Sequence, residues 1–227
     1  MPWSVNDIQL SLANELDQSS TAPAVTATDW IVRLNAINRS LRDWAESYDW
    51  DDLKKIYNAR ISTSTGNASL ALPNDFKKMD GYPKIVSDGS TAYEFPQVDP
   101  SKNRRYTDSD KYVNILGNES DGHVMYISAN TLASGASVQF TYYAYPASLS
   151  TTTSIPQIPD ATYLVQRTLY YMLKSKEDGR FPEAKVEADR ILARMIENQN
   201  TRGLGHADRR VSVGPEPYYN WRVGKDG

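Results

Sequence analysis

Helical periodicity occurs towards both ends of this 227-residue chain, and a stretch with the pattern of β-strands separates the two helical parts. In the first part, large side chains recur every three or four residues, which places them on one face of an amphipathic helix. So many large side chains on one stripe cannot face solvent, so this helix must pack against a partner, which we expect to be the two helices of the C-terminal part. The stripe comprises Trp30, Leu34, Ile37, Leu41, Trp44 and Tyr48, and the first five are the predicted helical core.

Three further helices are expected from local signals. Ser4, followed by Asp7 three residues later, predicts a capping box at the start of an N-terminal helix. After the linker at 148–159, Asp160 is a plausible cap for a helix that ends at Gly179, and Pro182 suits the first turn of a last helix. These signals predict a bundle made from both ends of the chain.

The central region has the sequence pattern of an antiparallel β structure. Gly89 supplies the backbone freedom for a tight turn between residues 84–86 and 91–95, which predicts a hairpin. A second hairpin is expected from residues 112–116 and 123–127, and short strands are expected at 69–72 and 138–145.

The predicted fold class is therefore α+β, with a helical bundle lobe, an inserted small antiparallel β lobe and an extended C-terminal arm. The helical lobe is assigned to residues 1–60 and 157–200, and the β lobe to residues 61–150. The arm is assigned to residues 201–227, because helical periodicity disappears there and glycines become frequent.

Composition excludes most catalytic chemistry. The chain has no Cys and only two His, so thiolate nucleophiles, disulfides and His-rich metal sites are not expected. No glycine-rich phosphate loop and no nucleophile elbow occurs, and the acidic residues fall mainly in turns and caps. We expect no enzyme activity, no catalytic residue, no cofactor and no metal.

We expect neither association with a membrane nor a general affinity for nucleic acid. The first residues lack the basic and apolar regions of a signal peptide, and no apolar run is long enough to span a bilayer. A net charge of −3 argues against a protein that coats nucleic acid non-specifically.

The C-terminal arm contains several aromatic and Arg residues. Side chains of these types contribute most of the binding energy at protein interfaces, so we expect the arm to anchor an interface. The alternative is a terminus that folds back on its own domain. The predicted docking residues are Arg209, Arg210, Tyr218, Tyr219, Trp221 and Arg222.

One dense basic cluster lies in the predicted β lobe, at Lys102, Arg104 and Arg105. These cations could contact DNA phosphates or an acidic partner. The alternative is a solvated loop.

The order of several short motifs resembles the head-to-tail adaptor, or connector, proteins of tailed bacteriophages, particularly those of podovirus-like virions and tubular tails. The motifs run in family order over about residues 26–200. They are Trp30 with Leu34-Asn35-Ala36-Ile37-Asn38, Leu72-Pro73-Asn74-Asp75-Phe76, Asp88-Gly89 before Tyr93, Val138 to Tyr143 before Pro146 and Leu149, and Ile158-Pro159-Asp160 before Leu164-Val165 and Leu169.

The resemblance implies a structural virion protein at the head-tail junction, present in the host cytoplasm during assembly. It implies a ring, usually of twelve copies, that joins the portal protein to a tail nozzle or tube protein around the DNA channel. It also implies an arm that reaches into the portal, and DNA that passes without sequence-specific binding.

An alternative function is a tail module that binds host surface glycans. Eight of the 15 Tyr lie between Tyr82 and Tyr145, and aromatic faces stack on sugars. The sequence shows no internal repeat of the kind found in long tail fibres or spikes.

Overall fold

The structure is a computed structural model that describes residues 2–61, 68–86, 92–99, 111–128 and 135–211, with side chains described as far as Thr201. It has four helices and two antiparallel sheets within these ranges, which confirms the α+β class. The chain divides into two compact units, which are described separately. The helical unit contains residues 3–40 and 159–227, and the β unit contains residues 41–158.

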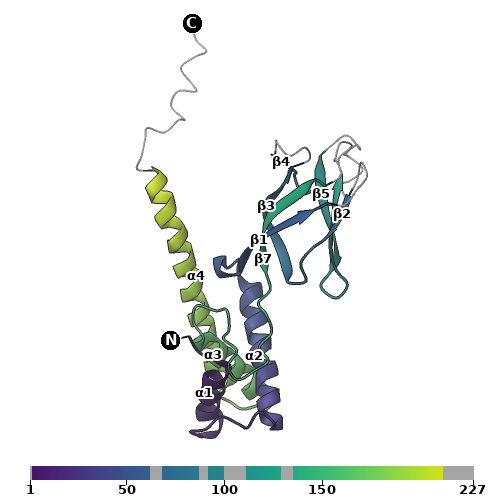
Figure 1. Ribbon diagram of the computed structural model, residues 1–227. Helices are drawn as coiled ribbons and strands as arrows, with labels where there is room; N and C mark the ends of the chain where they lie inside the picture. The colour runs from purple at the N-terminus through teal and green to yellow at the C-terminus, as the bar shows by residue number, and fades with distance from the viewer. Residues whose placement is uncertain (1, 62–67, 87–91, 100–110, 129–134, 212–227) are drawn as a thin grey trace. The chain divides into compact units, whose positions relative to one another are not determined.

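The helical unit is built from both ends of the chain. Its helices are α1 (Val5–Asp17), α2 (Thr28–Ser47, of which residues 28–40 belong to this unit), α3 (Thr162–Ser175) and α4 (Phe181–Val211). Figure 1 shows α1 and α3 beside the amino-terminal half of α4. The predicted capping box is confirmed, since the Asp7 amide donates to Ser4 Oγ and the Ser4 amide donates to Asp7 Oδ2.

Polar contacts fix how α2 packs in this unit. The Gln9 side-chain amide on α1 donates to the Trp30 carbonyl oxygen at 3.1 Å, and both residues are buried. The hydroxyls of Ser40 on α2 and Thr168 on α3 lie 3.0 Å apart in a fully buried position. Because buried polar groups require such partners, these pairs specify the facing surfaces of the three helices.

Helix α4 is longer than the sequence predicts. It continues to Val211, whereas the extended arm was expected to begin at residue 201. Gly203 and Gly205 lie inside the helix, because a glycine costs only about 1 kcal/mol in a helix interior and does not by itself end a helix of 31 residues. Residues 201–211, the first part of the expected arm, are therefore helical, and residues 212–227 lie outside the described residues.

The β unit contains two antiparallel sheets over one hydrophobic core. The first has the order β1-β7-β3-β4, and the second has the order β2-β6-β5. Side chains of both sheets meet in the core, including Phe76, Phe140 and Tyr142 from the first sheet and Val113, Met125 and Ile127 from the second. The strands are β1 (Lys54–Arg60), β2 (Ala68–Ala71), β3 (Phe76–Val86), β4 (Ala92–Glu94), β5 (Tyr112–Asn118), β6 (Gly122–Ser128) and β7 (Ser137–Ala144).

Both predicted hairpins are confirmed. Strand β3 pairs with β4 in the register Ile85 to Tyr93, and β5 pairs with β6 in the register Ile115 to Met125. Two strand boundaries differ from the sequence prediction. Strand β1 pairs along its whole length with β7, so residues 54–60 belong to a sheet and not to the helical lobe. Strand β3 extends back to Phe76, with a register shift between Asp80 and Lys84.

The carboxyl end of α2 belongs to the β unit, which changes the expected packing of its stripe. We expected the stripe to pack against the two C-terminal helices. Trp44 instead stacks on Trp50, which precedes the short 3-10 turn η1 (Asp51–Leu53), with ring centroids 4.9 Å apart. Large aromatic rings bury more area against each other than against small helix-face residues, so the tryptophans form their own cluster.

Candidate docking surfaces

One face of α4 is fixed to the helical unit by a narrow buried stripe. Ala184, Ala188, Ile191, Met195 and Gln199 recur every three or four residues and are all buried. Small residues at the first two positions allow close approach of α3. Gln199 is the last buried position with a described side chain, and the α4 backbone continues for a further twelve residues, or about 18 Å.

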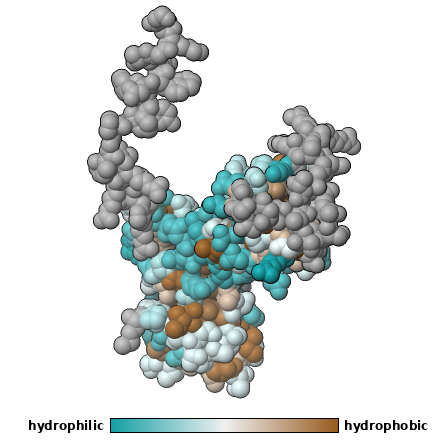
Figure 2. Space-filling model, turned by 45° about the horizontal axis from the view of Figure 1, so that its top comes forward, coloured by the Kyte–Doolittle hydropathy of each residue, from teal (hydrophilic) through white to brown (hydrophobic). Residues whose placement is uncertain are grey.

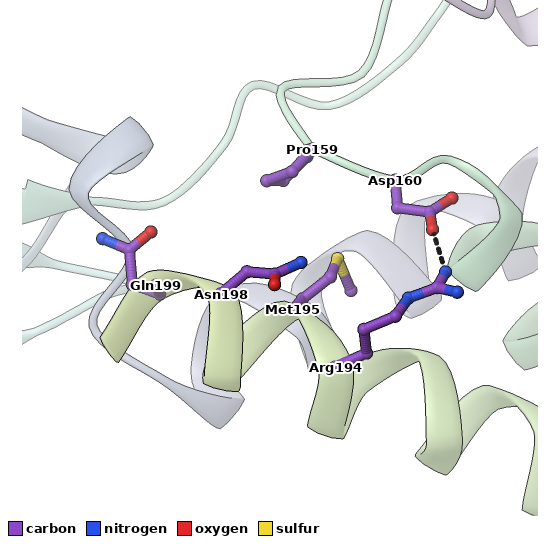
Figure 3. A pocket seen from close by; sticks show the side chains of 6 residues that line it. All are labelled: Pro159, Asp160, Arg194, Met195, Asn198 and Gln199. Atoms are coloured by element: carbon purple, nitrogen blue, oxygen red, sulfur yellow. Dashed lines mark hydrogen bonds and ion pairs between the residues drawn. The ribbon is translucent and has the colours of Figure 1, made fainter. Parts of the chain in front are cut away.

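A pocket of about 310 Å³ lies beside the last buried turns of α4. Figure 3 shows Met195, Asn198 and Gln199 rising from one face of α4 towards Pro159, which precedes α3. Asp160 and Arg194 form the other side of the pocket, and the Arg194 guanidinium donates to Asp160 Oδ2 at 2.6 Å. The pocket therefore joins the entry of α3 to the carboxyl half of α4.

Asp160 is held in its ionised form by its neighbours. Burial alone raises the pKa of this carboxyl group, but hydrogen bonds from the Thr162 hydroxyl and amide and the ion pair with Arg194 outweigh burial, so the pKa lies below its usual value. The same carboxylate caps the first turn of α3, as the sequence predicted for Asp160, although the residue directly preceding the helix is Ala161.

The pocket suits binding and not bond-making chemistry. Its one carboxylate is locked in an ion pair, and its other polar groups are the neutral amides of Asn198 and Gln199. Among the described residues no three His, Asp or Glu side chains are grouped to hold a metal ion. The pocket can accept an apolar side chain against Pro159 and Met195 and hydrogen-bond a neighbouring peptide group through the amides.

The predicted helical core residues are found in both units. Trp30 and Ile37 are buried in the helical unit, and Leu41 and Trp44 are buried in the β unit. Leu34 is only half-buried. The stripe thus serves two cores, because the boundary between the units falls within α2.

The predicted basic cluster and most of the predicted docking arm lie outside the described residues. Lys102, Arg104 and Arg105 fall in the range 100–110, and Tyr218, Tyr219, Trp221 and Arg222 fall in the range 212–227. Arg209 and Arg210 lie on the α4 backbone, so they are helical and not part of an extended segment.

The structure brings together one group that the sequence analysis did not identify. Arg39 on α2 lies over the ring of Tyr171 on α3, with its guanidinium carbon 4.0 Å from the ring centroid. Arg167 lies over both Tyr170 and Tyr171, and Lys174 lies over Tyr170. The spacing of Arg167, Tyr171 and Lys174 marks one helix face in the sequence, but nothing local in the sequence indicates that Arg39 joins it.

Exposed apolar residues gather near the start of α2. Val25, Ile31 and Val32 are each about half exposed. Figure 2 shows hydrophobic residues on the surface of the helical unit, in the lower part of the view. No helix among the described residues has the length and apolar character needed to cross a bilayer.

The sequence model of one protein family, described as SU10 adaptor protein, matches residues 4–215, which cover nearly the whole chain. The chain belongs to this family. The resemblance to phage head-to-tail adaptors is thereby confirmed, and the chain is a structural adaptor protein of a bacteriophage virion. No curated protein matches it.

Membership in the SU10 adaptor family has two consequences for the surfaces described above. An adaptor interacts with other head and tail components of the phage, so its pocket and its exposed apolar residues are candidate contacts with those components. The family is one of structural proteins, and it gives no support to the alternative of a glycan-binding tail module.

Proposed function

We propose that this adaptor forms a ring that joins the portal to the tail around the DNA channel at the head-tail junction. The observation that carries the proposal is the family match, which extends over both units and through the whole of α4. A protein that must contact a head component and a tail component benefits from two separately folded units. The helical unit and the β unit meet this requirement.

The helical unit is the proposed portal-binding part. Its longest helix continues about 18 Å beyond Gln199, the last buried position with a described side chain, and the six anchor residues of the C-terminal segment lie in or after this extension. Aromatic and Arg side chains are the types that contribute most of the binding energy at protein interfaces. The β unit is then the proposed contact for the tail nozzle or tube protein.

The ring is proposed to contain twelve copies, and its strength is proposed to come from repetition. A few anchors in one copy give modest affinity, because ordering the segment costs roughly 1–2 kcal/mol per residue in backbone entropy. Many copies held at once on a symmetric partner convert modest affinity into a durable joint. The free protein is expected to be monomeric or weakly associated until the portal gathers the copies.

The direct test is reconstitution with the portal protein of the same phage. Purified adaptor and portal are mixed, separated by size exclusion and weighed by mass photometry. A complex with one closed ring of adaptor per portal supports the proposal, and imaging of that complex gives the copy number. Failure to bind portal under conditions where both proteins are folded would contradict it. A stable twelve-membered ring of adaptor alone at low micromolar concentration would overturn the proposed assembly order.

A further inference from the structure

Three cations on α2 and α3 are held over a pair of tyrosines in the helical unit. Arg39, Arg167 and Lys174 each lie over the ring of Tyr170 or Tyr171, with the guanidinium carbon or ammonium nitrogen 4.0–5.5 Å from the ring centroid. The two rings are themselves in contact, with centroids 5.2 Å apart. We call these five residues the cation–tyrosine face.

Two of these cations, Arg39 and Lys174, have no carboxylate partner within the described part of the chain. The third cation, the Arg167 guanidinium, lies 3.8 Å from the Asp189 carboxylate on α4. Among the described residues, Lys174 donates to the Tyr170 hydroxyl at 3.2 Å, and Arg39 contacts the Tyr171 ring. By contrast, four cations on α4 or next to it each form an ion pair with an acidic residue. They are Arg180, Lys185, Arg190 and Arg194.

The chemistry of the face favours a polyanion over a protein surface. The rings are largely covered, since Tyr170 is only 9% exposed, so little apolar area remains for the core of a protein interface. The exposed groups are the cationic N–H donors of Arg39 and Lys174, which the rings beneath them hold in place. Phosphate oxygens accept such donors, and duplex DNA presents one negative charge per about 1.7 Å of its axis.

We propose that the cation–tyrosine face contacts the phosphate backbone of the DNA that passes through the adaptor. This inference rests on the proposed function, because a ring around DNA presents the same face once per copy. The contact is independent of sequence, since only phosphates are engaged. It is also weak in each copy, which allows DNA to slide.

The test uses the full chain and a fluorescent 30-base-pair duplex, with anisotropy measured between 20 and 200 mM salt. Two phosphate contacts, from Arg39 and Lys174, give a slope of log affinity against log salt near −1.8, or about a 12-fold loss between 50 and 200 mM salt. The double variant Arg39→Gln/Lys174→Gln retains only Arg167, which is paired with Asp189, so its affinity is expected to change little over this interval. Arg39→Lys keeps the charge and is expected to keep the wild-type slope.

The matched control is Arg180→Gln/Arg190→Gln, which removes two exposed cations that are already paired with Asp178 and Glu187. Its slope is expected to match that of the wild type, and circular dichroism with thermal melting confirms that all variants fold. The inference is overturned if the wild type does not bind the duplex at 20 mM salt, or if both double variants change the slope equally. It is also overturned if Arg39→Gln/Lys174→Gln loses portal binding and not DNA binding, since the face then recognises an acidic protein. Portal reconstitution tests the proposed function separately, so a failure of DNA binding alone leaves the ring intact.

Discussion

The indole N–H of Trp50 donates to the main-chain carbonyl oxygen of Trp44 at 2.7 Å, and the two indole rings stack on each other. Both residues are almost completely buried. Tyr48 packs its ring against the edge of Trp50 at a centroid distance of 5.2 Å. The end of α2 is thus fixed to the β unit by an aromatic cluster that also satisfies one of the orphan carbonyls of the helix.

We predict that Trp44→Ala lowers the free energy of unfolding by about 3–5 kcal/mol, because it removes a fully buried ring and leaves a cavity against Trp50. Chemical denaturation measures the effect. Trp3→Ala is the control, since Trp3 is 37% exposed and its loss should change stability much less. Equal denaturation midpoints for wild type and Trp44→Ala would show that the cluster is not part of the core.

Lys77 on β3 also binds the carboxyl end of α2. Its ammonium group donates to the carbonyl oxygens of Ala45 and Tyr48 at 2.6 and 3.0 Å, and its side chain is only 14% exposed. We predict that Lys77→Met costs about 1.5–3 kcal/mol, because charged hydrogen bonds to the helix end are lost. The neighbouring Lys78→Met removes an exposed ion pair with Asp49 and a distant contact over the Tyr143 ring, and it should cost less than about 1 kcal/mol. Thermal unfolding of the two variants compares them directly, and similar losses would contradict a capping role for Lys77.

Acid sensitivity should depend in part on Asp160. The pKa of this carboxyl is lowered in the folded protein, so its contribution to stability is present above the unfolded pKa of about 3.9 and is lost as the pH falls through the folded value. The stability difference between wild type and Asp160→Asn should therefore be constant above about pH 5 and shrink below pH 4. Denaturation from pH 7 to pH 2.5 measures it. Asp52→Asn is the control, because Asp52 is exposed and forms no ion pair with any described residue, so its substitution should change stability much less.

Removal of residues 212–227 should separate folding from docking. We predict that a chain ending at Val211 keeps its helical content and its unfolding midpoint, since the last buried position with a described side chain is Gln199. The same chain should lose portal binding, and Trp221→Ala in the full chain should weaken portal binding by more than about 2 kcal/mol, as expected for a central anchor. Asn220→Ala is the neighbouring control. A truncated protein that still binds portal at the wild-type concentration would assign docking to the helical unit itself, with the pocket of Figure 3 as the next candidate.

Local sequence patterns were sufficient to predict those parts of the protein that depend on neighbouring residues. The Ser4–Asp7 capping box, the cap supplied by Asp160 and the two hairpins are interactions over a few positions, so their residue types and spacing predict them. The order of short motifs along the chain was likewise sufficient to indicate the adaptor family.

Contacts between residues that are far apart in the sequence became evident only from the tertiary structure. Strand β1 has five exposed residues of seven, so it lacks the alternation that marks a half-buried strand, and only pairing with β7 some eighty residues later makes it part of a sheet. Strand β3 contains Gly81 and Pro83, which are typical of turns, and the sheet accommodates them at a register shift where Gly81 has a φ of +75°. Arg39 and Tyr171 lie on different helices and meet only when α2 packs on α3. Local sequence carries no record of such contacts, because their free energy comes from surfaces that exist only after the chain has folded.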